Sequence, residues 1–170
     1  MDDASKMTAM DGRIRRVRVD EIDELVRLSL LAWAPVFASF ERVLGPAIFA
    51  RLYPDWRSGQ ESVVREMCGE CEDRVTWVAE LDGAIAGFVV IELNVEPAVG
   101  EIQLLAVHPD HQNRGIGTGL NAFALDEMAV AGMKLAVVGT GGDPGHAPAR
   151  RSYEKAGFIA LPLVRYYKDL

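Results

Sequence analysis

The sequence predicts an α+β fold, or a three-layer α/β arrangement, with a central sheet covered by helices on both faces. Three observations lead to this prediction. Apolar residues with helical spacing come first, and a group of strand-like segments follows them. Asp82-Gly83 joins two of those segments as in a β-hairpin. A glycine-rich run, residues 112–119, then links a third strand to another helix.

The first part of the chain is expected to be mainly helical. Residues 1–12 are polar and lack periodicity, so we expect a flexible tail there, followed by a single domain over residues 13–170. Pro35 is expected to end the first helix and to leave residues 36–45 as a loop or broken helix. The further expected elements are a strand at 14–19, a helix at 20–34, and a helical region at 46–71 broken near Tyr53-Pro54 and Ser58-Gly59.

Strands and helices alternate in the second part of the chain. Asp82-Gly83 predicts a tight hairpin between strands at 75–81 and 84–95. Gly132 and Gly157 are expected to end helices. The other expected elements are a strand at 100–107, a helix at 117–131, a strand at 134–139, a helix with its body at 150–155, and one or two closing strands within 158–167, broken by Pro162.

Length, composition and charge narrow the classes of function. A chain of 170 residues favours one domain, and no apolar run approaches the length of a membrane span. The 25 acidic residues exceed the 18 basic ones, which argues against binding to nucleic acid or to an anionic membrane surface. We therefore expect a cytoplasmic monomer or homodimer that acts on a cationic or neutral small molecule.

Two short motifs suggest metal or redox chemistry only weakly. Cys68-x-x-Cys71 has no second pair, so too few thiolates are available for a four-cysteine zinc site. A redox dithiol stays open, although incidental cysteines are favoured. His108-x-x-His111 contains a Pro-Asp turn that cannot place both rings on one helical face. We predict a surface turn there and no metal site.

The glycine run Gln112-Asn113-Arg114-Gly115-Ile116-Gly117-Thr118-Gly119 is typical of a phosphate-binding turn. A helix that starts there would direct free N–H groups and its positive dipole end at an anion. The spacing G-x-G-x-G does not match the dinucleotide-binding fingerprint G-x-G-x-x-G. The run also lacks the Lys-Ser or Lys-Thr pair of a P-loop. A flexible turn without a ligand is the alternative.

The glycine run and two further segments of the chain resemble motifs of the GNAT acetyltransferase superfamily. Gln112 to Gly117 match its Q/R-x-x-G-x-G/A motif. Leu105-Ala106-Val107-His108-Pro109 resembles the strand and turn before that motif, and Tyr153-Glu154-Lys155-Ala156-Gly157-Phe158 resembles the family's Y-E-K-x-G-F. The resemblance covers about residues 99 to 160. It implies a mixed and mostly antiparallel sheet that splays between its fourth and fifth strands, and transfer of an acetyl group from acetyl-CoA to an amine.

The resemblance also implies how acetyl-CoA would be held. Main-chain groups of one strand would bind the pantetheine arm as an added strand, backbone N–H groups of the glycine run would bind the pyrophosphate, and residues 134–139 would form the opposite wall. His146 stands where the family usually has an asparagine, so it could bind pantetheine, act as acid or base, or cap a helix. The implied cofactor residues are Leu105, Ala106, Val107, Gln112, Asn113, Arg114, Gly115, Ile116, Gly117, Thr118 and His146.

Two residues are expected to carry the proton transfers. An ammonium with a pKa of about 10.4 cannot attack a thioester, and the departing thiolate benefits from a proton. Glu101 matches the catalytic glutamate of some family members, and Tyr153 matches the tyrosine that protonates the CoA sulfur. Strand alternation predicts that Glu101 shares a face with Gln103, Leu105 and Val107. A solvated glutamate and a core tyrosine are the alternative interpretations.

The acceptor is expected to be a small-molecule amine or a peptide amine. Family members commonly build the acceptor site from their first two helices, the connection between them and the loop before the last strand, and these segments here contain Trp33, Phe37 and Glu41. An aromatic rim with an acidic residue would suit an amine cation. A non-catalytic acyl-CoA sensor or partner-binding domain on the same fold is the alternative function.

Overall fold

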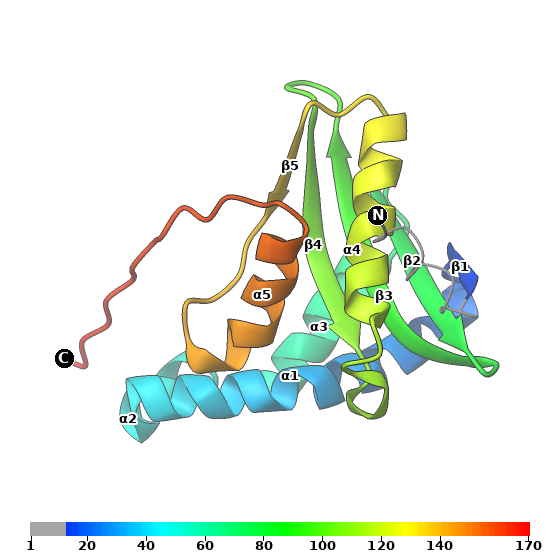
Figure 1. Ribbon diagram of the computed structural model, residues 1–170. Helices are drawn as coiled ribbons and strands as arrows, with labels where there is room; N and C mark the ends of the chain where they lie inside the picture. Colours follow the sequence, from blue (N-terminus) through cyan, green and yellow to red (C-terminus); the bar gives the residue numbers. More distant parts are fainter. Residues whose placement is uncertain (1–12) are drawn as a thin grey trace.

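A five-stranded sheet in the order β1-β2-β3-β4-β5 forms the centre of the protein (Figure 1). The computed structural model describes residues 13–170, so the predicted tail at residues 1–12 lies outside the described residues. The strands are β1 (Arg13–Arg16), β2 (Arg74–Leu81), β3 (Ala84–Asn94), β4 (Val99–Val107) and β5 (Leu135–Val138). The helices are α1 (Ile22–Leu44), α2 (Pro46–Leu52), α3 (Trp56–Cys68), α4 (Ile116–Val130) and α5 (Ala147–Lys155), with short 3-10 turns η2 (Val19–Glu21), η3 (Pro109–His111) and η4 (Pro144–His146).

Helices cover both faces of the sheet, so the predicted fold class is confirmed. The first three strand pairs are antiparallel and β4 pairs with β5 in parallel. On one face, Leu25 of α1 and Val64 of α3 pack against Val90 and Phe88 of β3. On the other face, α4 contributes Leu120 to a second cluster that contains other residues of the same strands. Alternating side chains of the strands therefore supply two cores.

The β2–β3 hairpin confirms the clearest local prediction. Asp82 and Gly83 have φ angles of +53° and +80°. Two consecutive residues with positive φ are what a two-residue type I′ turn requires, and its twist matches that of the flanking strands. The Asp-Gly dipeptide thus sets how β2 and β3 align at the hairpin.

Helix α1 is a single helix of 23 residues, so the predicted end at Pro35 and the predicted loop at 36–45 are wrong. A proline inside a helix removes one backbone hydrogen bond and costs about 3 kcal/mol. Tertiary packing offsets this cost, because Val36 and Phe37 are buried directly after the proline. Phe37 stacks on Trp56 of α3, with ring centroids 4.4 Å apart.

Helices α2 and α3 are separated near Tyr53-Pro54, as predicted. The second predicted break, at Ser58-Gly59, is wrong because α3 continues through both residues. Asp55 caps this helix by accepting a hydrogen bond from Ser58 N at 3.2 Å. Ser58 is therefore part of a helix start, where a small polar residue is compatible with helical structure.

No strand follows α5 in the part of the chain that the structure describes, so the predicted closing strands within 158–167 are wrong. The chain leaves the end of α5 in an extended conformation and runs towards α2 (Figure 1). Asp169 lies there with Oδ1 2.6 Å from Nε of Arg51. Pro162 lacks an N–H group for a strand ladder, and the path of the segment carries it away from β5.

Strands β4 and β5 are paired over only four residues. Val99 to Ile102 lie opposite Leu135 to Val138, after which β5 ends. Strand β4 continues to Val107 with β3 alone beside it among residues 13–170. The predicted splay between the fourth and fifth strands is confirmed.

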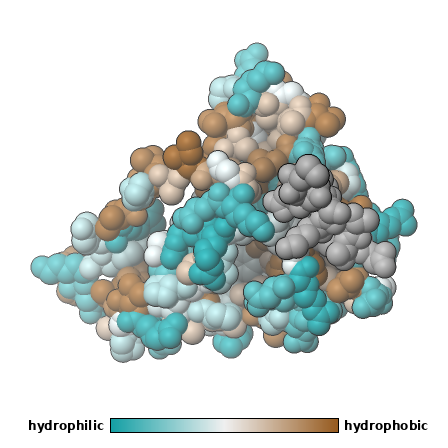
Figure 2. Space-filling view, in the orientation of Figure 1, coloured by the Kyte–Doolittle hydropathy of each residue, from teal (hydrophilic) through white to brown (hydrophobic). Residues whose placement is uncertain are grey.

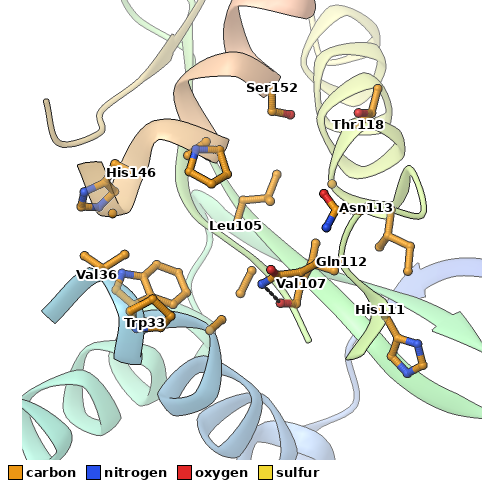
Figure 3. A pocket seen from close by; sticks show the side chains of 18 of the residues that line it. Trp33, Val36, Leu105, Val107, His111, Gln112, Asn113, Thr118, His146 and Ser152 are labelled. Carbon is orange, nitrogen blue, oxygen red and sulfur yellow. Dashed lines mark hydrogen bonds between the residues drawn. The ribbon is translucent and has the colours of Figure 1, made fainter. Parts of the chain in front are cut away.

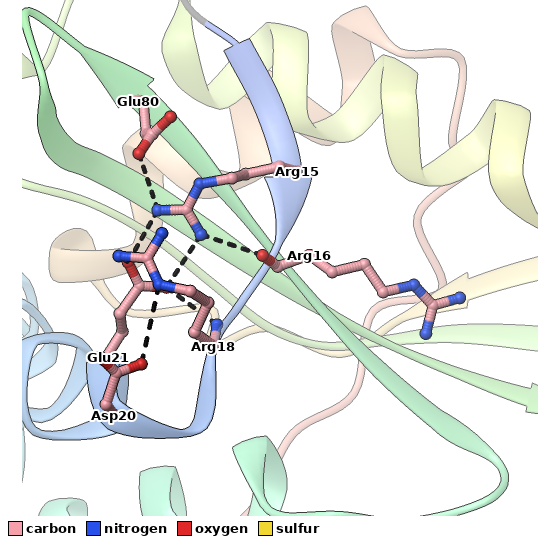
Figure 4. A network of polar contacts seen from close by, with 6 residues as sticks. All are labelled: Arg15, Arg16, Arg18, Asp20, Glu21 and Glu80. Atoms are coloured by element: carbon pink, nitrogen blue, oxygen red, sulfur yellow. Dashed lines mark hydrogen bonds and ion pairs between the residues drawn. The ribbon is translucent and has the colours of Figure 1, made fainter.

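Charged residues connect the first strand to the start of α1 (Figure 4). The guanidinium of Arg15 donates to both carboxylate oxygens of Glu21, at 2.7 and 2.8 Å, and to Glu80 of β2 at 2.7 Å. Glu21 Oε2 also accepts from the backbone N–H of Arg18. The hydrogen bond from Arg15 lowers the pKa of the buried Glu21 to about 2.

Within residues 13–170, no helix combines the length and apolarity needed to cross a bilayer.

We predict that Glu21→Gln lowers the free energy of unfolding by roughly 2 to 3 kcal/mol at neutral pH. Because the folded-state pKa lies below the unfolded value, this stabilisation is present above about pH 4.5 and is lost as the pH falls towards 2. Urea unfolding of both proteins between pH 7 and 3 measures the difference. A difference that does not shrink on acidification would contradict the prediction.

Candidate functional site

A cavity of about 350 Å³ opens where β4 and β5 diverge (Figure 3). This volume lies within the usual range for small-molecule sites. Four segments line the cavity: the middle of α1, the end of β4, the turn before α4 with its first residues, and η4 with the start of α5. The lining residues labelled in Figure 3 are Trp33, Val36, Leu105, Val107, His111, Gln112, Asn113, Thr118, His146 and Ser152.

The end of β4 presents free peptide groups to this cavity. His108 N donates to Ala86 O at 2.8 Å, which fixes the direction in which alternate peptide groups point. The N–H and C=O groups of Leu105 and Val107 therefore point away from β3, towards the open edge. Gln112 Nε2 donates to the carbonyl of Val107 from that side, at 3.2 Å (Figure 3). An extended ligand with amide groups can pair with this edge as an added strand.

The turn before α4 has the backbone geometry of an anion site. Asn113 and Gly115 have φ angles of +61° and +83°, in the left-handed region. The first hydrogen bond of the helix runs from Gly119 N to Gly115 O, so the N–H groups of the preceding helical residues are not used inside α4. The first turn contains no acidic residue. These N–H groups and the helix dipole favour a phosphate at this end of the cavity.

Most of the predicted cofactor residues meet at the cavity, and one does not. The residues that line it are Leu105, Ala106, Val107, Gln112, Asn113, Gly115, Ile116, Gly117, Thr118 and His146. Arg114 is exposed and lies outside the lining residues. A solvated arginine, the alternative interpretation of this residue, agrees with that position.

Glu101 lies on the face of β4 opposite to the one predicted from simple alternation. Register between β3 and β4 shifts so that Val90 faces Leu104 while Ile91 faces Ile102, which leaves Gln103 as an extra residue. Glu101 faces Glu92, whose carboxylate accepts a hydrogen bond from Gln103 at 3.3 Å. Leu105 and Val107 instead pack on the α4 side with Ile102. The bulge reverses the alternation, so the shared face predicted for Glu101, Leu105 and Val107 is wrong.

Tyr153 is on the side of α5 that approaches the cavity, although it is not among the lining residues. Ala149 and Ser152 line the cavity, and Tyr153 follows Ala149 by one helical turn. Its ring packs edge-on against Phe158, with centroids 5.9 Å apart. Burial raises the pKa of Tyr153 above the ordinary value of its phenol.

His146 is held in the cavity wall by a buried carboxylate. Its Nδ1 lies 2.5 Å from Oδ1 of Asp143, and Gly145 N donates to the other oxygen of Asp143 at 2.8 Å. Burial favours the neutral carboxyl, but hydrogen bonds from Ser39 and His146 outweigh it and lower the pKa of Asp143. With Nδ1 engaged by the carboxylate, Nε2 is the ring nitrogen left for a ligand.

The loop that carries this pair is fixed against α1. Gly145 N also donates to Ser39 Oγ at 3.0 Å. A Cβ atom at Gly145 would come within 2.8 Å of Ser39 Cβ, so only glycine permits this close approach. Arg150 donates to the carbonyls of Gly141 and Asp143 from α5. The wall opposite β4 is therefore built from one loop and two helices.

Of the three predicted acceptor residues, the structure brings Trp33 to the cavity. Phe37 is buried between Trp56 and Tyr53, so its ring supports α1 from behind. Glu41 is exposed and lies outside the lining residues. Of the predicted aromatic rim, the Trp33 indole alone therefore lines the cavity.

The His108-x-x-His111 and Cys68-x-x-Cys71 motifs lie in different places relative to the cavity. His111, expected in a surface turn, lines the cavity, and its Nδ1 is buried. Both cysteines are free thiols. Burial raises the pKa of Cys68 to about 11, whereas Arg74 lowers the pKa of the exposed Cys71. Neither cysteine lines the cavity.

Three polar residues at the site were not predicted from the sequence. They are Asp143, Ser39 and Ser152, and the hydroxyl of Ser152 accepts from Asn121 of α4 at 2.8 Å. Ser152 lies six residues after His146 and one before Tyr153, spacings that do not share a helical face, so neither predicted residue indicated it. Asp143 and Ser39 meet only through a contact between residues far apart in the sequence, which no local pattern indicates.

Comparison with known proteins identifies the family. Residues 45–158, more than half of the chain, match the model of the Acetyltransferase (GNAT) family. The chain belongs to this family. The resemblance seen in the sequence is thus confirmed.

Individual relatives match the chain over different lengths. A mycothiol acetyltransferase from Sanguibacter keddieii is 36% identical over 86 residues, which are 48% of this chain and 27% of that protein. The match thus spans about a quarter of the length of this curated relative. A PaiA N-acetyltransferase from Thermoplasma acidophilum, solved in complex with coenzyme A, has a TM-score of 0.64 at 17% identity and covers 88% of this chain and 91% of its own. A ribosomal-protein-alanine N-acetyltransferase from Brucella melitensis has a TM-score of 0.61 at 20% identity, with 94% and 99% covered.

Gly117→Leu is predicted to abolish binding of acetyl-CoA. A Cβ at Gly117 would lie 3.5 Å from Val107 Cγ2, so a larger side chain extends into the space between the helix start and β4. Thermal denaturation with and without acetyl-CoA measures the binding, since ligand at 100 times its Kd adds about 2.7 kcal/mol.

The matched control is Gly59→Leu, also inside a helix, where an added Cβ meets nothing within 4 Å. This control should keep the shift in melting temperature. A full shift in the Gly117→Leu protein would show that the ligand binds elsewhere.

Proposed function

We propose that this protein transfers an acetyl group from acetyl-CoA to an amine, with both substrates bound together so that the amine attacks the thioester directly. One observation carries the proposal: the free peptide edge of β4 and the left-handed turn before α4 adjoin along one side of the cavity. An extended amide chain that ends in a diphosphate is complementary to this pair of features. Membership of the GNAT family and the coenzyme A complex of the PaiA neighbour support the proposal.

The two features set the direction of the bound ligand. With the diphosphate at the turn before α4, the pantetheine arm extends along β4 from Val107 towards Leu105. Its thioester end then lies nearer the point where β4 and β5 separate, at Ile102 and Val138. Glu101 adjoins that point in the sequence, and the side of α5 that carries Tyr153 approaches the cavity.

Tyr153 is the proposed acid. In the reaction, a bond forms between the amine nitrogen and the acetyl carbon, and the bond from that carbon to sulfur breaks. The departing thiolate takes the phenolic proton of Tyr153, which is later replaced from solvent. The ordinary pKa of tyrosine is about 10 and burial raises it further, so this phenol carries the proton at neutral pH.

Glu101 is the proposed base, and it takes the amine proton directly or through a water molecule. The face that it shares with Glu92 and Gln103 is the face covered by α1 and α3, from which an acceptor can approach without crossing the α4 side. His146, oriented by Asp143, is the second group in the site that can accept a proton. At the cavity wall it is also placed to hydrogen-bond the pantetheine arm.

The proposed acceptor is a small-molecule amine or a peptide amine. Trp33 offers an aromatic face at the cavity, and the chain has a net charge of −7, so a cationic amine is favoured over an anionic one. The names of the relatives include both a mycothiol acetyltransferase and a ribosomal-protein-alanine acetyltransferase. Both classes of acceptor therefore belong in the test.

Release of free CoA thiol from acetyl-CoA, measured with a panel of amines, tests the proposed function. The panel should contain small polyamines, aminoglycosides, amino acids and peptides with a free N-terminus. We expect release that depends on the acceptor. Binding of acetyl-CoA without such release would contradict the enzyme and favour an acyl-CoA sensor on the same fold.

Tyr153→Phe is expected to lower kcat by roughly 10² to 10⁴ while leaving the affinity for acetyl-CoA nearly unchanged, because only the proton donor is removed. Tyr166→Phe, at an exposed tyrosine outside the cavity, is the matched control and should retain the wild-type rate. Equal rates for wild type and Tyr153→Phe would rule out the assignment of the acid.

A pair of variants identifies the base. Glu101→Gln is expected to lower kcat by roughly 10² to 10⁴, while His146→Asn retains most of the wild-type kcat. Acceptor-dependent thiol release at saturating acetyl-CoA gives the answer. If His146→Asn lowers kcat and Glu101→Gln does not, the base is His146, and Asp143→Asn should then also lower the rate.

A further inference from the structure

Two polar side chains meet between α4 and α5, beside the cavity. Nδ2 of Asn121, in α4, donates a hydrogen bond to Oγ of Ser152, in α5, at 2.8 Å. Ser152 lines the cavity, and its side chain and that of Thr118 point into the gap between the two helices (Figure 3). Neither Asn121 nor Ser152 takes part in the proton transfers assigned to Tyr153 and Glu101. Elsewhere on the molecule, hydrophobic surface is scattered over several elements (Figure 2).

Asn121 is a costly side chain for the fold at its position. The residue is 0% exposed, and its Oδ1 atom is buried without a hydrogen-bond partner among residues 13–170. A buried polar atom without a partner lowers the stability of the folded protein, and an apolar side chain would avoid this penalty. Packing of α4 on α5 therefore does not explain why an amide stands here.

The contact with Asn121 limits the directions in which Ser152 can donate. A serine hydroxyl has one proton to donate, and its oxygen can accept through two lone pairs. Because this oxygen accepts from Asn121, its proton is directed elsewhere, and no acceptor for it is found among residues 13–170. Ser152 lines the cavity, so the hydroxyl is a free donor at the cavity wall.

The place of this donor matches the path of the proposed ligand. Asn121 follows Gly117 by four residues and Thr118 by three, so the three residues lie on one side of α4. The proposed diphosphate binds at the first turn of this helix, and the pantetheine arm continues from there through the cavity. Both parts of the ligand carry oxygen atoms that accept hydrogen bonds.

We propose that the hydroxyl of Ser152 donates a hydrogen bond to an oxygen atom of bound acetyl-CoA, and that Asn121 is the positioning residue that orients this hydroxyl. The assignment rests on the proposed function, which places acetyl-CoA in this cavity. It explains the buried amide, because the free energy lost at Asn121 is offset when the oriented donor binds the ligand. Ser152 then adds a side-chain donor to the backbone donors of β4 and of the turn before α4.

Titration calorimetry with acetyl-CoA tests the role of Ser152. We expect Ser152→Ala to raise the Kd by roughly 5- to 100-fold, the range for loss of one hydrogen bond to a neutral or a charged oxygen. Ser152→Thr keeps the hydroxyl and should restore most of the affinity. The matched control is Ser62→Ala, the same change at an exposed helical serine of α3, which should bind like the wild type.

Asn121→Ala distinguishes positioning from structural support. We expect weaker binding of acetyl-CoA, together with a melting temperature of the free protein within about 4 °C of wild type, because alanine favours a helix and Oδ1 has no partner to lose. Added to Ser152→Ala, this change should weaken binding little further, since both act through one hydrogen bond. Fully additive losses of affinity would contradict the positioning role.

Two fragments of the cofactor identify the oxygen that accepts. ADP carries a diphosphate without the arm, and pantetheine carries the arm without the diphosphate. In NMR titrations, Ser152→Ala should weaken binding of one fragment and leave the other unchanged. A wild-type Kd for acetyl-CoA in Ser152→Ala would overturn the assignment and leave the proposed function intact, whereas a wild-type protein that binds no acetyl-CoA would overturn both.

Discussion

The end of backbone pairing between β4 and β5 is the constraint on which the site depends. Beyond Ile102 and Val138, β4 keeps β3 as its neighbour and loses β5. Its outward peptide groups then face a cavity instead of a strand, and only a ligand or a side chain such as Gln112 can pair with them. A continuous parallel pair would fill the same space with backbone and leave no room for a cofactor arm.

The surrounding elements hold the two strands apart. Helix α4 packs on one face of the sheet and begins with the left-handed turn at Gly115. Helix α1 continues through Pro35 and contacts the loop of η4 through Ser39 and Gly145. The cavity therefore lies between two rigid helices and one tightly packed loop, which is the arrangement expected for a preformed site.

Local signals explain which parts could be predicted. Asp82-Gly83 specifies its own hairpin, and the glycine run specifies a strand, a turn and a helix start within a few residues. The continuation of α1 depends on burial of Val36 and Phe37, and the face of Glu101 depends on a bulge at Gln103. Both of these result from contacts with distant residues. Asp143 and His146 are only three residues apart, but the loop that brings them together is held by the distant Ser39, so no motif indicated this pair.

Backbone amide NMR during titration with acetyl-CoA tests whether the cofactor lies along β4 and against the turn before α4. We expect the largest changes in amide shift in two separate segments, at residues 113–118 and at Leu105 and Val107, with small changes at β1 and β2. The same titration with free acetate should leave the β4 amides unchanged, because acetate lacks the pantetheine arm. Saturable binding of acetyl-CoA that shifts other residues and leaves these two segments unchanged would contradict this placement of the cofactor.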